Sequence, residues 1–501
     1  MLLIFPPAAK ACEPPAGIAR LASALQAHGV SCRLLDANLE GQLWLLGQPL
    51  AADDTWSRRA AKNHSANISA LRTPKTYQNP DRYRRAVSDL NRLLAVSGRA
   101  TGSTAGLADY QQTVLSPVRS ADLIKAAELP DSNPFFPYFS LRLPELLAGI
   151  RTVGFSLNYL SQALCTFAMI GYLRRRYPHL KIVLGGGLVT SWMRRPDWSN
   201  PFGGLVDHLI DGEGEVALLS LCGVKPLPGL HVTPDYSALP LRNYLSPGLI
   251  LPYSAASGCY WNRCSFCPEQ AEGNHYRPVP LSQVLSDLQQ LTMEYSPVLI
   301  HLLDNAVSPA LLRGLARNPP GAPWYGFARV DEQLAEPGFC RALKQSGCVM
   351  LKLGLESGDQ EVLEQMRKGI SLELVSRVLF SLRQAGIAVY CYLLFGTPSE
   401  TEVKAQRTLD FVVQHHDAIR FLNLAVFNMP LFGNEAGEYG TKLFYEGDLS
   451  LYTAFKHPDG WDRAQVRRFL ESRFKRHPAV AEIVRNDPPQ FSSNHAPFFC
   501  S

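Results

Sequence analysis

The hydrophobic residues at the start of the chain follow the pattern of an α/β fold. The apolar run Leu2–Phe5 predicts a buried strand, and residues 18–25 repeat apolar side chains with the period of a helix that ends at Gly29. Cys32–Asp36 predicts a second short strand. Strands that alternate with helices in this way favour a parallel sheet covered by helices.

The alternation stops near residue 42 and returns near residue 151. The stretch 42–145 is rich in Ser, Ala, Arg and Asn, and we interpret it as an insertion with helical fragments near 82–95 and 105–115. Beyond it the sequence predicts a strand, a helix and two further strands, at 151–158, 161–176, Lys181–Leu184 and His208–Ile210. The proline-rich segment 225–250 has the composition of a linker.

A second series of alternating patterns follows the linker. Its predicted strands lie near 249–256, 298–303, 324–328, 349–355, 388–395 and 420–427. Between the first two, residues 281–295 predict a helix whose apolar face consists of Leu281, Val284, Leu285, Leu288 and Leu291. Six such units are too few for a closed eight-stranded barrel, so we expect a partial barrel with parallel strands. From 430 onward we expect a mixed C-terminal extension that is irregular and aromatic-rich.

These patterns divide the 501-residue chain into a front domain (1–222), a linker (223–248), a barrel (249–430) and a C-terminal extension (431–501). An apolar fraction of 46% and a charged fraction of 19% exclude a disordered chain. The 49 basic and 44 acidic residues are dispersed, so no basic stripe suits a nucleic-acid backbone. No apolar run approaches the roughly 20 residues that cross a bilayer, and the N-terminus lacks the features of a signal peptide. We therefore expect a cytoplasmic protein with no membrane or nucleic-acid partner.

Three of the eleven cysteines lie close together in the sequence. Cys259, Cys264 and Cys267 follow the first predicted barrel strand, at the end where parallel α/β folds place their chemistry. Three thiolates on one loop can hold three irons of a cubane cluster and leave the fourth iron open. The alternative is a structural zinc site, which needs a fourth ligand that His275 could supply.

The segment Cys259-Tyr-Trp-Asn-Arg-Cys264-Ser-Phe-Cys267 resembles the cluster loop of the radical S-adenosylmethionine (radical SAM) superfamily. That family usually has three residues between its first two cysteines, whereas this chain has four. The resemblance implies that the three cysteines bind a 4Fe-4S cluster whose open iron binds SAM. It also implies that an electron from a donor such as flavodoxin or ferredoxin leads to a 5′-deoxyadenosyl radical.

Other predicted strand ends match the same family in chain order. The resemblance implies that SAM is contacted by the residues Phe266, Asp304, Arg329, Glu356, Ser357, Gly396 and Thr397. Taken singly, an acidic residue such as Asp304 is more often a helix cap or a surface charge, and Gly396-Thr-Pro is an ordinary turn. The inference therefore depends on their occurrence at successive strand ends after the cysteine loop.

The front domain resembles the Rossmann-like cobalamin-binding domain that precedes many radical SAM enzymes. The resemblance implies that cobalamin is contacted by the residues Pro7, Glu13, Pro15, Gly17, Ser156, Asn158, Tyr159, Gly185, Gly186, Gly187, Glu213 and Gly214. The chain has no Asp-x-His-x-x-Gly motif, so we expect a cobalamin without a histidine ligand, with Tyr159 as a candidate neighbour of its lower face. The alternative is a Rossmann-like domain whose pocket binds nothing.

Together the two domains favour a cobalamin-dependent radical SAM C-methyltransferase that acts on an unactivated carbon of an unknown substrate. A radical SAM cyclase or rearrangement enzyme with the same cofactors is the second hypothesis, and a non-enzymatic cobalamin- or zinc-binding module is the third. We expect the extension 431–501 to cap the active site, although an aromatic tail is more often a packed domain edge.

Overall fold

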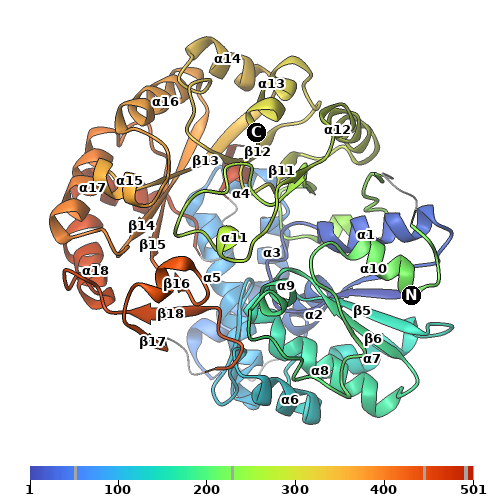
Figure 1. Ribbon diagram of the computed structural model, residues 1–501. Coiled ribbons are helices and arrows are strands. Elements are labelled where there is room, and N and C mark those ends of the chain that lie inside the picture. Colours follow the sequence, from blue (N-terminus) through green and yellow to red (C-terminus); the bar gives the residue numbers. More distant parts are fainter. Residues whose placement is uncertain (50–52, 227–230, 444–446, 490–494, 500–501) are drawn as a thin grey trace. The chain divides into compact units, whose positions relative to one another are not determined.

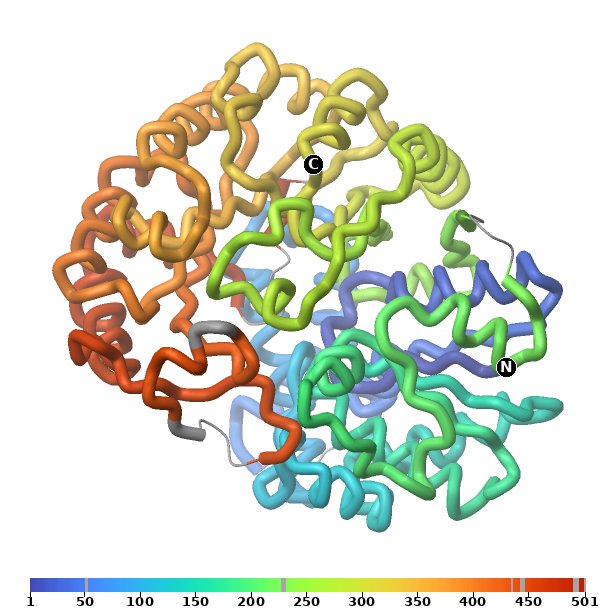
Figure 2. The backbone as a smooth tube through the Cα atoms, viewed as in Figure 1, coloured from blue at the N-terminus to red at the C-terminus, as the bar shows by residue number. Residues whose placement is uncertain are grey.

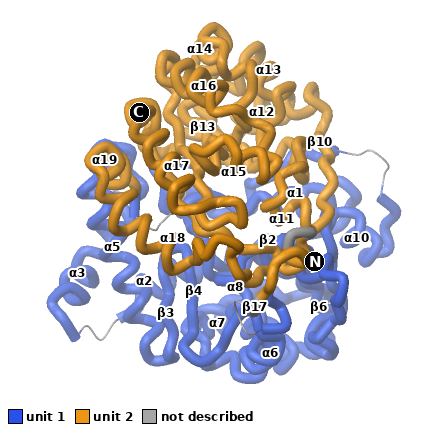
Figure 3. Tube along the Cα trace, turned by 60° about the vertical axis from the view of Figure 1, so that its left-hand side comes forward, with its two compact units in different colours: residues 1–249, 445–450, 488–493 blue, residues 250–444, 451–487, 494–501 orange. Residues whose placement is uncertain are grey.

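The computed structural model describes residues 1–49, 53–226, 231–443, 447–489 and 495–499. The chain forms two compact units, which Figure 3 colours separately. Unit 1 comprises residues 1–249, 445–450 and 488–493, and unit 2 comprises residues 250–444, 451–487 and 494–501. Among the described residues, no helix combines the length and the apolar composition that crossing a membrane requires.

A five-stranded parallel sheet forms the centre of unit 1 (Figure 1). Its strands are β1 (Leu2–Phe5), β2 (Arg33–Asp36), β5 (Thr152–Ser156), β6 (Lys181–Gly185) and β7 (His208–Leu209). Their spatial order is β2-β1-β5-β6-β7, and every neighbouring pair is parallel. The centres of β1, β5 and β6 are buried because helices cover both faces of the sheet. The strands predicted for this part of the chain are confirmed.

Two groups of helices cover this sheet. Helices α1 (Ala16–Ala27) and α10 (Gly214–Leu221) pack against each other on one face, and α2 (Ala37–Leu46), α7 (Phe136–Leu146) and α8 (Leu160–Arg176) cover the other (Figure 1). Helix α8 is buried without interruption from Gln162 to Leu173, because α6 (Ser120–Glu128) and α7 enclose it. A short helix, α9 (Gly187–Met193), follows β6.

The segment interpreted as an insertion is mostly helical. It contains α3 (Thr55–Leu71), α4 (Pro74–Tyr77) and α5 (Pro80–Ser97), so the helical fragment predicted near 82–95 is confirmed. The fragment predicted near 105–115 is wrong, because β3 (Ser103–Ala105) and β4 (Tyr110–Gln112) form an antiparallel hairpin there. The turn between them is closed by a hydrogen bond from the Gly106 amide to the Asp109 carbonyl.

Unit 2 is built on a six-stranded parallel sheet. Its strands are β8 (Ile250–Tyr253), β11 (Leu299–Leu302), β12 (Trp324–Ala328), β13 (Cys348–Glu356), β14 (Ala388–Phe395) and β15 (Phe421–Val426). Neighbouring strands of this sheet follow one another in chain order. The backbone therefore passes from each strand through a helix to the strand beside it, as Figure 2 shows. All six predicted strands are confirmed.

A helix follows each of the first five strands of this sheet. They are α12 (Leu281–Tyr295), α13 (Pro309–Arg317), α14 (Pro337–Gln345), the pair α15 (Gln360–Gln365) and α16 (Leu372–Ala385), and α17 (Glu402–Gln414). The bounds predicted for α12 are confirmed, and its side chains Val284, Leu288 and Leu291 are buried. Because every neighbouring pair of strands is parallel, the carboxyl ends of all six strands lie at one edge of the sheet.

The C-terminal extension is more regular than the sequence suggested. Its strands β17 (Thr441–Leu443) and β18 (Tyr452–Phe455) form an antiparallel sheet with β16 (Met429–Pro430), which ends just before the extension, and α18 (Arg463–Phe469) and α19 (Pro478–Asn486) follow. The prediction of an irregular tail is therefore wrong, because strands of two to four residues are too short to show a period of two. The ring of Phe455 joins this sheet to the barrel by lying 5.8 Å from the ring of Phe427.

Gly171 offers a test of the packing of α8 against α6. A methyl carbon at this position would lie 1.8 Å from the carbonyl oxygen of Ala127, so the two helices would have to separate. We expect Gly171→Ala to lower the free energy of unfolding by about 1–3 kcal/mol, measured by urea denaturation. The control is Gly203→Ala, because a methyl carbon there meets nothing within 4 Å. Equal stabilities for the two variants would contradict this account of the packing.

Candidate active site

The three clustered cysteines lie on one loop whose base is closed. The loop leaves β8 and returns as a two-residue ladder between β9 (Ala256–Ser257) and β10 (Arg277–Pro278). Gly258 turns the chain at this base with a φ of +71°, and a side chain there would lie 2.5 Å from the carbonyl oxygen of His275. Only glycine fits so close to the returning strand.

The cysteines in this loop are free thiols that differ in burial. Cys264 is buried, whereas Cys259 and Cys267 are half-buried. Burial raises the pKa of Cys264, and the nearby cations Lys368 and Arg329 oppose that rise. Burial also raises the pKa of Cys267 to about 11.

The loop fits an iron–sulfur cluster through its donor set. Three free thiols lie on one loop, with Arg329 Nη1 3.9 Å from the Cys264 sulfur. Two nearby cations would offset the negative charge of thiolate ligands. Within the described ranges, no three His, Cys, Asp or Glu side chains are arranged to hold a metal ion, so the fit rests on residue types and loop position.

Two of the expected cofactor contacts lie beside this loop. Arg329 follows β12 and is largely buried, and its guanidinium donates to the carbonyl of Lys368. Lys368 forms an ion pair of 2.7 Å with Glu356 at the end of β13 and lies 5.5 Å above the ring of Phe266. The structure therefore gathers Phe266, Arg329 and Glu356 around Cys264.

Asp304 holds the backbone that leads into the cysteine loop. Its carboxylate is buried and accepts a hydrogen bond of 3.1 Å from the amide of Ala255. Burial raises the pKa of Asp304 to about 6, although backbone donors partly oppose the rise. In this structure the carboxylate positions the loop, and its expected contact with SAM stays a prediction.

A buried carboxylate holds the turn after β14 by a hydrogen bond to its backbone. Glu400 Oε2 accepts hydrogen bonds from the Gly396 amide at 2.5 Å and from Trp461 Nε1 at 2.9 Å. Burial raises the pKa of Glu400 to about 7. The carbonyl of Thr397 accepts a hydrogen bond of 2.9 Å from His457 Nε2. Residues of the C-terminal extension thus determine the shape of this turn.

A pocket of about 300 Å³ brings two of the expected cofactor motifs together. Phe266 from the cysteine loop and Thr397 from the turn after β14 both line it. The hydroxyl of Thr397 is buried and has no hydrogen-bond partner among the described residues. Met366 and Tyr439 complete the wall, and sequence reasoning missed both, since neither belongs to a motif.

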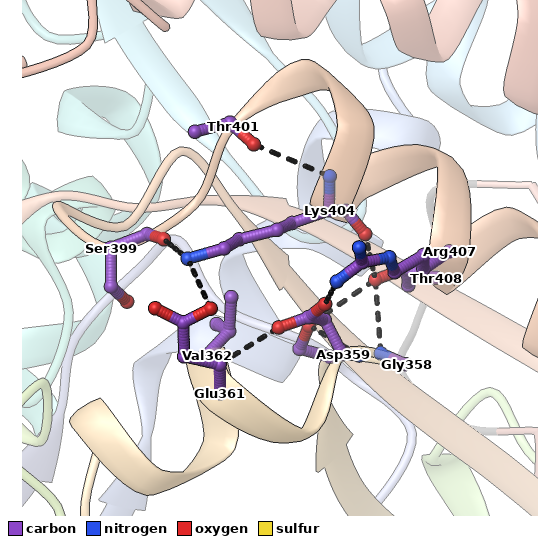
Figure 4. A network of polar contacts seen from close by, with 10 residues as sticks. Gly358, Asp359, Glu361, Val362, Ser399, Thr401, Lys404, Arg407 and Thr408 are labelled. Atoms are coloured by element: carbon purple, nitrogen blue, oxygen red, sulfur yellow. Dashed lines mark hydrogen bonds and ion pairs between the residues drawn. The ribbon is translucent and has the colours of Figure 1, made fainter.

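Ser357 has a different environment from the other expected SAM contacts. It is fully buried, and its hydroxyl lies 3.2 Å from that of Thr408 in α17. Figure 4 shows the adjoining network, in which Arg407 Nη1 donates to Asp359 at 2.6 Å and the Gly358 amide donates to Thr408 at 2.9 Å. This network joins the loop after β13 to the helix that follows the turn after β14, so the two motifs are positioned together.

In unit 1 the expected cobalamin contacts cluster at the carboxyl edge of the sheet. The order β2-β1-β5-β6-β7 changes direction between β1 and β5, because the chain first adds β2 on one side of β1 and then β5 on the other. Open α/β sheets bind ligands in the crevice at such a switch point. Pro7 follows β1, and Asn158 and Tyr159 follow β5, so these residues flank that point.

Side-chain amides tie the loops around the switch point together. Gln162 Nε2 donates to the carbonyl of Pro6 at 2.7 Å, and Gln162 Oε1 accepts from the Asn158 amide at 3.0 Å. Asn158 Oδ1 accepts from the amide of Gly187 after β6 at 2.9 Å. The loops after β1, β5 and β6 therefore form one rigid edge.

Exposed glycines on this edge leave its backbone accessible. Gly17 and Gly187 are exposed, and their nearest contacts for an added methyl group are Ser156 Oγ at 3.8 Å and Asn158 Oδ1 at 3.7 Å. Tyr159 is 56% exposed beside them. Such an edge lets a planar macrocycle approach the backbone closely. Of the other expected contacts, Pro7 is buried, whereas Glu13, Pro15, Gly185 and Gly186 are half-buried.

The two remaining expected contacts lie at the start of α10. Gly214 is half-buried there, and Glu213 is exposed and lies 3.8 Å from the guanidinium of Arg20. Arg20 also forms an ion pair with Glu215. Glu213 therefore lies near α1, the helix that follows β1.

Comparison with known proteins agrees with this site. Residues 327–412, from the end of β12 into α17, match the model of the radical SAM superfamily. The matched segment contains Arg329, Glu356 and Gly396, and the cysteine loop precedes it. The match therefore covers part of the sheet whose first strand precedes the cysteine loop. It confirms the resemblance to the radical SAM superfamily that the cysteine loop predicted.

Two curated relatives resemble longer parts of the chain than the family model covers. The bacteriochlorophyllide d C-12(1)-methyltransferase of Chlorobaculum tepidum is 27% identical over 258 residues, 49% of this chain and 52% of the relative. The hopanoid C-3 methylase of Methylococcus capsulatus is 26% identical over 276 residues, 48% of this chain and 52% of the relative. The chain thus spans about half the length of these relatives.

The similarity in fold extends over both units. The radical S-adenosylmethionine methyltransferase TsrM of Kitasatospora setae, solved with tryptophan substrate and a SAM analog, matches with a TM-score of 0.55 and 16% identity. The match covers 97% of this chain and 89% of that chain. At this identity the likeness establishes a shared fold.

Glu400 should make stability depend on pH. Its pKa rises from an ordinary value of 4.5 to about 7 on folding, so the native state holds a proton that the unfolded state has lost between these values. Stability should therefore fall as pH rises through this range, because a charged carboxylate is buried. We expect Glu400→Gln to reduce that fall, measured as the melting temperature across the same range. Glu373→Gln, at an exposed position of α16, should leave the profile unchanged. Parallel profiles for the wild type and Glu400→Gln would contradict the buried protonated carboxyl.

Proposed function

We propose that this protein is a cobalamin-dependent radical SAM enzyme that methylates an unactivated carbon. The observation that carries the proposal is the cysteine loop at the carboxyl edge of a radical SAM domain, where Cys264 lies beside Arg329 and the pocket formed by Phe266 and Thr397. Methyltransferases among the relatives support methyl transfer as the reaction.

In this proposal the residues of unit 2 hold a 4Fe-4S cluster and SAM. Cys259, Cys264 and Cys267 are the cluster ligands, and the ion pair between Lys368 and Glu356 fixes a carboxylate at the rim of the pocket. Phe266 and the turn at Gly396 and Thr397 receive the adenine end of SAM, with the unpaired Thr397 hydroxyl available to a polar ligand. Asp304, Arg329 and Ser357 are the other proposed contacts of SAM, and their hydrogen bonds also hold the loops around it.

The front domain, residues 1–222, is proposed to bind cobalamin at its switch point. Gly17, Gly187 and the loop at Asn158 would present backbone to the macrocycle, and the exposed Tyr159 is the candidate neighbour of its lower face. When bound, the cluster would supply the electron that cleaves SAM, and cobalamin would supply the methyl group. The protein's part is to orient the substrate and to exclude water.

Cyclisation is a second candidate reaction. The anaerobic magnesium-protoporphyrin IX monomethyl ester cyclase of Rubrivivax gelatinosus is 22% identical over 260 residues, 49% of this chain and 46% of that relative. A cyclase of this kind would use the same cofactor residues without methyl transfer.

The remaining parts of the chain complete the proposal. We assign residues 223–248 as the linker, 249–430 as the catalytic barrel and 431–501 as the cap of the substrate site. The proposed electron donor is of the flavodoxin or ferredoxin type.

Anaerobic turnover tests the proposal. The wild-type protein, reconstituted with iron, sulfide and cobalamin and supplied with SAM and a reductant, should produce 5′-deoxyadenosine. Cys264→Ala should abolish this product because one cluster ligand is lost. Cys222→Ala, a half-buried cysteine of unit 1, should retain it.

The products distinguish the candidate functions. S-adenosylhomocysteine formed in step with substrate turnover identifies a methyltransferase, and substrate turnover with 5′-deoxyadenosine but no S-adenosylhomocysteine identifies a cyclase or rearrangement enzyme. A colourless protein that binds zinc and no iron would overturn both the methyltransferase and the cyclase. It would instead support the third hypothesis, a non-enzymatic binding module.

Gly187 offers a separate test of cobalamin binding. A leucine there would project from the exposed start of α9 onto the accessible edge, so we expect Gly187→Leu to weaken cobalamin binding on the order of tenfold or more. The measurement is the absorbance of cobalamin retained after gel filtration. Gly203→Leu, also exposed in unit 1, is the matched control. Equal retention by both variants would place cobalamin elsewhere.

A further inference from the structure

The cysteine loop contains one residue more than the usual spacing of its family, and the longer stretch includes a local turn. Asn262 lies between the first two cysteines and adopts a left-handed conformation with a φ of +44°. Its side-chain amide donates to the carbonyl of Asn274 at 3.4 Å, on the returning arm of the loop. The stretch between the first two cysteines therefore turns next to Trp261.

That turn directs Trp261 onto the connection between α15 and α16. The indole lies against Gly369, where an added methyl carbon would be 2.2 Å from the ring. Trp261 Nε1 donates to the carbonyl of Arg367 at 3.3 Å. Any side chain at position 369 would displace the indole, so the two residues are complementary in shape.

Arg329 connects Trp261 to the buried cysteine. Its guanidinium carbon lies 4.1 Å from the centre of the indole ring, well within the range of a cation–π interaction. The same guanidinium donates to the carbonyl of Lys368 and lies 3.9 Å from the sulfur of Cys264. The residue after that cysteine, Ser265, donates its amide to the carbonyl of Met366 at 3.1 Å.

The contacts on both sides of Cys264 thus lead to one short connection, residues 366–369. We propose that Trp261 is a positioning residue that fixes the longer cysteine loop, and with it Cys264, against this connection. The role deepens the proposed function, because it concerns a ligand of the proposed cluster. Its consequence is that the extra residue adds an anchoring contact to the loop without displacing Cys264.

The first test uses the protein without added iron and measures the reactivity of individual thiols. In Trp261→Ala the rate of alkylation of Cys264 by iodoacetamide, followed by mass spectrometry, should rise on the order of tenfold, because the cation–π contact and the indole hydrogen bond are lost. Cys340 is fully buried in the same unit and serves as the internal reference. Trp261→Phe keeps an aromatic face for Arg329 and should lie between the alanine variant and the wild type.

The matched control is Trp56→Ala in unit 1. Arg92 lies 5.1 Å from the ring of Trp56, so this variant also removes an arginine–tryptophan contact, far along the chain from the cysteines. It should leave the alkylation rate of Cys264 unchanged. Gly369→Ala should also raise the alkylation rate, because its methyl group displaces the indole and its φ of +68° strains the connection with any other residue.

The second test follows the cluster itself. After anaerobic reconstitution, Trp261→Ala should hold several-fold less iron per chain than the wild type, and the electron paramagnetic resonance spectrum of its reduced cluster should respond differently to SAM. An alanine variant with wild-type alkylation, iron content and spectrum would overturn the positioning role. Wild-type protein that holds no iron would instead overturn the proposed function, whereas the alkylation result would still decide whether Trp261 fixes Cys264.

Discussion

The structure depends on one constraint, the parallel pairing of strands whose short connections return the chain to the same side. In unit 2 this pairing runs in chain order from β8 to β15, so every loop that follows a strand opens at one edge. The cysteine loop, Arg329, Glu356 and Gly396 come from different strands and yet share that edge. In unit 1 the same pairing, combined with a change of direction beside β1, produces the accessible edge at Asn158.

The sheets bring these loops to one edge, and buried carboxylates then hold the loops in place by hydrogen bonds. Asp304 accepts from the backbone before the cysteine loop, and Glu400 accepts from the backbone of the turn after β14. In unit 1, Asp36 is buried, with its pKa raised to about 6, and accepts a hydrogen bond from Tyr244 at 2.7 Å. Each of these groups is costly to ionise away from water, so each is retained with donors aimed at it. The site is rigid because its supports are polar and enclosed.

The sequence was sufficient to predict the strands and the position of the cysteine loop, because burial on both faces leaves continuous apolar runs and thiolates have a distinctive spacing. It was insufficient for contacts made between distant segments. Nothing near Trp261 indicates that its ring meets Gly369, and nothing near Glu400 points to Trp461. The hairpin at 103–112 was missed because Ala105 and Leu107 favour a helix locally, while pairing across a turn decided the outcome. Ser357 occupies a motif position, yet its burial against Thr408 depends on a helix fifty residues further on.

The path of the polypeptide through the two units has a consequence for synthesis on the ribosome. Unit 1 is not contiguous, because residues 445–450 and 488–493 belong to it although nearly all of unit 2 precedes them in the chain. The amide of Leu449 donates to the carbonyl of Val118 at 2.9 Å, and Asp448 accepts from the amide of Ser120 at 2.8 Å. In a nascent chain that has emerged only to residue 249, the Val118 carbonyl and the Ser120 amide therefore lack the hydrogen-bond partners that residues 448 and 449 later supply. The front unit is completed after the barrel has been translated, so the two must mature as one molecule and cannot be separated by a single cut.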